Sequence, residues 1–165
     1  MERDEWLDSR LSPEQAGVLR DLRVVVSPER EADLYSLIVF WRRQIAKLRG
    51  DLSRPDSDRT VWGAHDYVAA LFTRDAVAEG LDLVRLEPST LAVVDVLDGE
   101  FMSCTEPDDT SLLTKVDDSV EPGSGWWWAR IPVSGPARRE IARTARGVPS
   151  WRITQSQPRL LDDPP

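Results

Sequence analysis

The sequence predicts an α+β fold with N-terminal helices packed on a small antiparallel β-meander, followed by a C-terminal helix. Three observations predict it: helical spacing of apolar residues in the first half, an Asp-Gly dipeptide between two β-rich runs, and the helix start Ser134-Gly135-Pro136. Runs of helices followed by runs of strands are typical of this class. At 165 residues we expect one domain over 1–154 and a flexible, proline-containing tail over 155–165.

The first half of the chain is expected to be helical. Ser12 and Gln15 have the spacing of a capping box around a proline in the first turn. Apolar residues then recur at helical spacing, and Gly80 stands where a C-cap would. The predicted helices are 13–23, 28–49 and 60–79, with a short strand or buried exit at 24–26.

The second half of the chain is expected to supply the meander and the last helix. Asp98-Gly99 is a hairpin dipeptide between two runs of strand-forming residues. Helix 28–49 should pack lengthwise on the sheet. The predicted strands are 91–97, 100–104 and 126–133, with 112–116 as a further candidate, and the last helix runs from 136 to about 146.

Composition indicates a soluble cytoplasmic protein with no membrane segment. The charged N-terminus leads into no apolar run, and no apolar stretch approaches the ~20 residues of a membrane helix. Cys104 is the only cysteine, which excludes an intramolecular disulfide framework. Nineteen arginines against two lysines, with abundant Asp, Val and Ala, indicate a bacterial, GC-rich genome.

The net charge of −8 is unevenly distributed. Residues 81–125 carry −9, whereas residues 126–165 carry +4. A nucleic-acid partner is therefore disfavoured, because phosphate neutralisation needs a net basic face. We expect a partner protein, basic in character, whose encounter the acidic segment would speed.

No catalytic residue, metal ligand set or cofactor is predicted. His65 is the only histidine, and Asp66 beside it would point about 100° away on a helix. Nothing near Cys104 suggests an activated thiolate. Neither a phosphate-binding glycine loop nor a Gly-x-Ser-x-Gly elbow occurs.

The triplet Trp126-Trp127-Trp128 is the most unusual feature. In a strand, Trp126 and Trp128 would point to one face and Trp127 to the other. The triplet is either core or a partner surface, since tryptophan is enriched at interface hot spots. The predicted binding residues are Trp126, Trp127, Trp128, Glu106, Asp108 and Asp109.

The final helix carries a basic stripe at Arg139, Arg143 and Arg146. Such a stripe can bind phosphate, but it is more often a solvated face or an internal partner for acidic segments.

The leading functional hypothesis is a non-enzymatic bacterial protein-binding module, such as an immunity- or antitoxin-like inhibitor or an adaptor. One alternative is a small carboxylate-dependent enzyme that uses Asp95, Asp98 or Glu100, with or without a divalent metal. Another is a subunit of a larger bacterial or phage assembly, which would self-associate.

Overall fold

The computed structural model describes residues 4–147, and the predicted tail 155–165 lies outside this range. The helices are α1 (Glu5–Asp8), α2 (Pro13–Asp21), α3 (Leu34–Asp51), α4 (Ala64–Leu83), α5 (Pro88–Cys104) and α6 (Gly135–Ala145), with 3-10 helices η1 (Leu113–Lys115) and η2 (Trp126–Ala129). The strands are β1 (Arg23–Ser27), β2 (Arg30–Asp33), β3 (Thr105–Pro107) and β4 (Arg130–Pro132).

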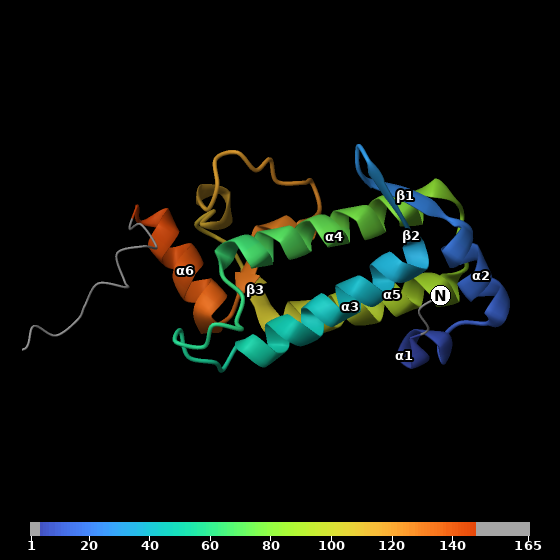
Figure 1. Cartoon of the computed structure of the whole chain (residues 1–165), viewed down its shortest axis with the longest axis horizontal. Helices are drawn as coiled ribbons and strands as arrows, with labels where there is room; N and C mark the ends of the chain where they lie inside the picture. Colours follow the sequence, from blue (N-terminus) through green and yellow to red (C-terminus); the bar gives the residue numbers. More distant parts are fainter. Residues whose placement is uncertain (1–3, 148–165) are drawn as a thin grey trace, which may run out of the picture.

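The α+β class is confirmed, with two antiparallel two-stranded sheets in the described part of the chain. The long helices α3, α4 and α5 lie side by side (Figure 1). The β1–β2 hairpin stands at one end of these helices together with α1 and α2. The β3–β4 sheet and α6 lie at the opposite end.

The capping box of α2 is confirmed. The Ser12 hydroxyl accepts the N–H of Gln15, and the Gln15 side chain accepts the N–H of Ser12. The following helix, predicted over 28–49, begins later, at Leu34. Residues 28–33 instead complete the β1–β2 hairpin, and Asp33 caps α3 by accepting the Ser36 N–H at 2.8 Å.

The prediction that Gly80 ends its helix was wrong, because α4 continues to Leu83. Gly80 serves close packing instead. A Cβ at this position would lie 2.7 Å from the Leu34 side chain and 2.9 Å from that of Val24. The glycine therefore lets α4 approach both α3 and the hairpin.

The predicted strands 91–97 and 100–104 were wrong, since both lie in the continuous helix α5. Pro88 stands in its first turn, and its buried residues recur at helical spacing. Asp98 is one of these buried residues. The dipeptide Asp98-Gly99 lies within the helix and makes no turn. Helix α3 accordingly packs on α4 and α5 and not on a meander.

Two smaller strand predictions also changed. Residues 113–115 form the 3-10 helix η1. The segment predicted as strand 126–133 begins as η2 and becomes strand only at Arg130. There β4 pairs with β3, and Glu106 lies opposite Ile131.

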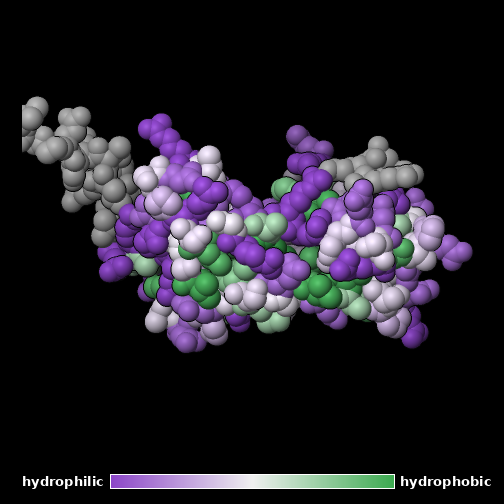
Figure 2. Space-filling view, turned by 90° about the horizontal axis from the view of Figure 1, so that it is seen from below, coloured by the Kyte–Doolittle hydropathy of each residue, from purple (hydrophilic) through white to green (hydrophobic). Residues whose placement is uncertain are grey.

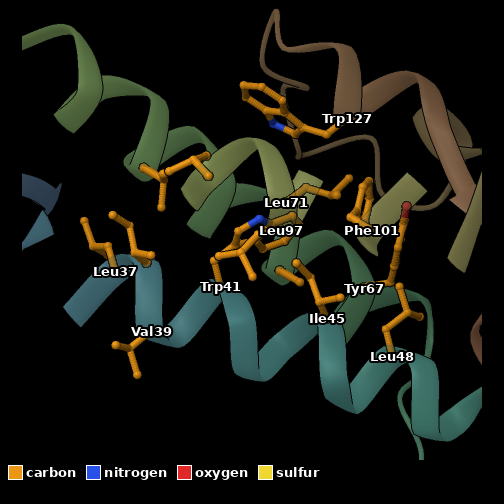
Figure 3. Close-up of a cluster of buried hydrophobic side chains, with 14 of the residues drawn as sticks. Leu37, Val39, Trp41, Ile45, Leu48, Tyr67, Leu71, Leu97, Phe101 and Trp127 are labelled. Atoms are coloured by element: carbon orange, nitrogen blue, oxygen red, sulfur yellow. The ribbon is translucent and has the colours of Figure 1, made fainter. Parts of the chain in front are cut away.

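The core is formed by the facing sides of the three long helices. The Trp41 and Phe101 rings lie 5.1 Å apart, and Tyr67 stacks on Phe101 at 6.4 Å. Full burial of each such side chain contributes roughly 1.5–3 kcal/mol. Side chains from α3, α4 and α5 that converge in Figure 3 include Trp41, Ile45, Tyr67, Leu71, Leu97 and Phe101.

One ion pair is buried within this helical layer. Arg74 of α4 donates from Nε and Nη2 to the two carboxylate oxygens of Asp98 in α5, at 2.9 and 2.8 Å. Both side chains are nearly inaccessible. The pair joins the two helices with fixed geometry, because the guanidinium and carboxylate match as two forks.

The surface is predominantly hydrophilic, with hydrophobic side chains gathered in patches near the middle of one face (Figure 2). Within residues 4–147, no helix combines the length and the hydrophobicity required to cross a lipid bilayer.

Replacing Asp98 by Asn should lower the free energy of unfolding by about 3–5 kcal/mol, because Arg74 would keep a buried charge without a counter-charge. The matched control is Glu100→Gln, which removes an exposed partner of Arg49 on the same helix and should cost below about 1 kcal/mol. Urea unfolding of both variants measures the difference. Equal losses would contradict a special role for the buried pair.

Stability should decline at alkaline pH partly through Tyr67. Burial raises the pKa of its hydroxyl, which donates to the carbonyl of Arg130 at 2.8 Å. A raised folded-state pKa gives stability that is complete below the unfolded pKa of about 10 and is lost as pH rises above it.

Tyr67→Phe should therefore cost about 1 kcal/mol at neutral pH and flatten the alkaline decline. Urea unfolding across the pH range measures both effects. An unchanged alkaline slope in this variant would show that other groups cause the decline.

Candidate functional site

The tryptophan triplet folds back onto α4, where one carboxylate holds two of the indoles. Asp75 accepts the Trp127 N–H at 2.8 Å and the Trp128 N–H at 3.0 and 2.9 Å. Both indoles are buried, with about 7% of each residue exposed. Buried indole N–H groups need such acceptors, so Asp75 fixes where the triplet lies.

Two glycines before the triplet make this approach possible. A Cβ on Gly123 would lie 2.6 Å from Nε1 of Trp128 and 2.7 Å from an oxygen of Asp75. A Cβ on Gly125 would overlap the Trp127 ring. The Gly-Ser-Gly sequence is thus explained by the close passage of the backbone over the carboxylate and the indoles.

The triplet also covers the buried ion pair. The Arg74 guanidinium carbon lies 4.2 Å from the centre of the Trp127 ring, a cation–π contact. Trp126 is the exposed member, at 41%, and its ring lies 6.1 Å from that of Phe101. The expected alternation of a strand was wrong because η2 is a 3-10 helix, which directs Trp127 and Trp128 into the same buried cluster.

The predicted acidic binding residues have structural partners. Glu106 pairs with Arg138 at 2.9 Å. Asp108 accepts the N–H groups of Leu112 and Leu113, both at 2.8 Å, and so orders the turn before η1. Asp109 is exposed.

Arginines from elsewhere in the chain also partly neutralise the acidic segment 81–125. Arg74 pairs with Asp98, and Arg49 with Glu100 at 3.2 Å. Of the carboxylates proposed for an enzyme, Asp95 is exposed whereas Asp98 is buried. The three carboxylates therefore do not converge on one cavity.

A second candidate site is a groove between the β1–β2 hairpin and the helices α3 and α4. It has a volume of about 400 Å³. Its walls come from the hairpin, α3 and α4, and they carry four exposed large apolar side chains: Val25, Val26, Phe40 and Phe72. Asp75 and Glu79 are its acidic residues, and Arg30 its basic one.

The groove connects directly to the triplet. The Phe72 ring meets the Trp128 ring edge-on, with centroids 5.0 Å apart. Asp75 lines the groove while holding both indoles. The buried tryptophans therefore support one wall of the groove.

Sequence reasoning missed the groove because its residues come from three separate segments. Phe40 and Phe72 were visible only as apolar residues in predicted helices. The one local signal was the pair Val25-Val26, a strand-forming run next to charged residues.

The remaining candidate groups do not form a reactive centre. His65 is largely exposed, 3.7 Å from Asp117. The Ser119 hydroxyl and N–H, with the nearby His65, lower the pKa of Asp117. Cys104 is buried. Across the described residues, no three His, Cys, Asp or Glu side chains cluster as metal ligands would.

No family model matches the chain, and comparison with curated proteins and with solved structures gives no significant match.

Gly123→Ala should destabilise the protein by about 1–3 kcal/mol, since the added methyl displaces buried hydrogen-bonded groups. Gly99→Ala is the matched control, because nothing lies within 4 Å of its added Cβ. At this exposed position within α5, the alanine should raise stability by up to about 1 kcal/mol. Thermal unfolding and tryptophan fluorescence of both variants test this. A neutral Gly123→Ala would refute the close approach.

Proposed function

We propose that the protein is a non-enzymatic protein-binding module whose binding surface is the apolar groove between the hairpin and α3–α4. The observation that carries the proposal is the gathering of four exposed large apolar side chains around one hollow. Soluble monomeric proteins rarely expose large contiguous apolar patches, and such patches commonly mark interaction sites.

The apolar residues stand on separate walls, as an anchor site requires. Val25 and Val26 lie on the hairpin, at 55% and 37% exposure. Phe40 of α3 and Phe72 of α4 line the same groove, at 52% and 44%. An apolar side chain inserted between these walls would contact both and lose its water, which is the physical basis of a hot spot.

Charge specifies the partner. The ionisable groups of the groove are Asp75, Glu79 and Arg30, which leave one negative charge in excess. The whole chain carries −8. We therefore assign the groove to a segment of another protein that carries apolar residues next to Lys or Arg, because opposite charge speeds encounter and restricts the choice of partner.

Binding through the tryptophan triplet 126–128 with Glu106, Asp108 and Asp109 stays a prediction. It has weaker support than the groove, because Glu106 and Asp108 already have partners within the chain. The enzyme alternative has less support, since Asp98 is engaged with Arg74. An inhibitor or adaptor of bacterial origin accords with the arginine-rich composition.

The groove predicts which peptides the protein selects. A random-peptide display library should yield ligands with apolar residues beside Lys or Arg. The double variant Val25→Asp/Phe40→Asp should bind them at least about tenfold more weakly, because loss of hot-spot anchors costs about 2 kcal/mol or more. Fluorescence anisotropy measures the affinities.

The matched control is Val96→Asp/Met102→Asp, which changes two similarly exposed apolar residues of α5, outside the groove. It should bind like the unmodified protein. Peptides that bind both variants equally would overturn the proposal. A dimer in light scattering that Val25→Asp/Phe40→Asp dissociates would instead assign the groove to a second copy of this chain.

A further inference from the structure

A second hollow lies on the opposite end of the molecule, on the outer side of α6. Its volume is about 330 Å³. Its described lining consists of four arginines and one alanine: Arg138, Arg139, Ala142, Arg143 and Arg146. Four of these five described residues are arginines, in a chain whose net charge is −8.

The arginines are only partly neutralised by the protein. Arg139 pairs with Asp56 at 2.7 Å, and Arg138 with Glu106 at 2.9 Å. Arg143 reaches the same Asp56 only at 3.9 Å, beyond hydrogen-bonding distance. Among residues 4–147, four cations therefore share two carboxylates, which leaves an excess of two positive charges in the described lining.

Other acidic and acceptor groups do not remove this excess. The carboxylate of Glu140, also on α6, accepts the N–H of Ala64 at 2.7 Å. Arg146 donates to the carbonyl of Ala142, which carries no net charge. Asp58 pairs with Arg54.

The described lining is suited to an anion. Several guanidinium groups around one hollow offer many N–H donors, which match an anion with several acceptor oxygens.

We propose that this hollow binds a phosphate group, either free phosphate or the phosphate of a small phosphorylated molecule. A phosphate monoester carries about −1.5 to −2 at pH 7 and three acceptor oxygens. It would therefore balance the excess charge of the described lining. Nucleic acid is disfavoured, because the net charge of −8 on the chain repels a long polyanion.

The test is a titration of the full chain with inorganic phosphate, followed by amide NMR. Chloride at equal ionic strength is the control for screening. Saturable shifts should appear in α6 and around Asp56, and Arg143→Gln and Arg146→Gln should each weaken binding by about tenfold. Arg10→Gln, at the other end of the molecule, should leave binding unchanged, and circular dichroism checks that every variant is folded.

Further probes distinguish the ligands. Glycerol phosphate binding more tightly than inorganic phosphate would support a phosphorylated small molecule, and the reverse order would support free phosphate. Shifts identical to those with chloride, or unaffected by Arg143→Gln, would overturn the proposal. Tighter, length-dependent binding of single-stranded DNA would overturn it in favour of nucleic acid.

Discussion

The pair Arg74–Asp98 is the interaction on which the rest of the structure depends. Two charges that are out of contact with water are tolerated only when each meets the other in good geometry, and here both hydrogen bonds are shorter than 3 Å. The pair fixes α4 against α5. It also fixes the cation on which the Trp127 ring rests. The position of the segment after η1 therefore follows from the contact between two helices.

From this centre, a chain of contacts runs to the surface. Asp75, next to Arg74 in sequence, holds both buried indoles. Trp128 in turn meets Phe72, whose outer side lines the groove. A side chain exposed at 44% would ordinarily sample several rotamers, whereas one backed by a buried, hydrogen-bonded indole is restricted. Restriction before binding lowers the entropy lost on association. The buried tryptophans thus support a wall of the proposed binding surface from the interior of the protein.

Local signals predicted four of the six described α-helices and failed where distant residues decide the structure. Capping and apolar spacing predicted α2, most of α3 and α4, and α6. The β-branched run before Asp98 was misread as a strand, because nothing in its local sequence shows that Asp98 meets Arg74 from α4. The sequence likewise left open whether the tryptophan triplet lies in the core or on the surface. Its placement depends on Asp75, 51 or more residues earlier in the sequence. The groove could not be predicted, since its walls come together only in the folded chain.

Counting charge along the sequence also misplaced the acidic surface. Residues 81–125 present less unpaired negative charge than their sum of −9 suggests, because arginines from α3, α4 and α6 pair with three of their acids. The remaining unpaired charges of the two candidate sites lie at different positions along α4. The carboxylate of Glu140 in α6 meets α4 at Ala64, whereas the nearer acid of the groove is Asp75. Eleven residues of helix separate these points by about 16 Å, about twice the screening length of about 8 Å at physiological salt. An arginine-lined hollow and an acidic apolar groove can therefore coexist on one small protein, and an anion bound at α6 would scarcely alter the potential that a basic partner meets at the groove.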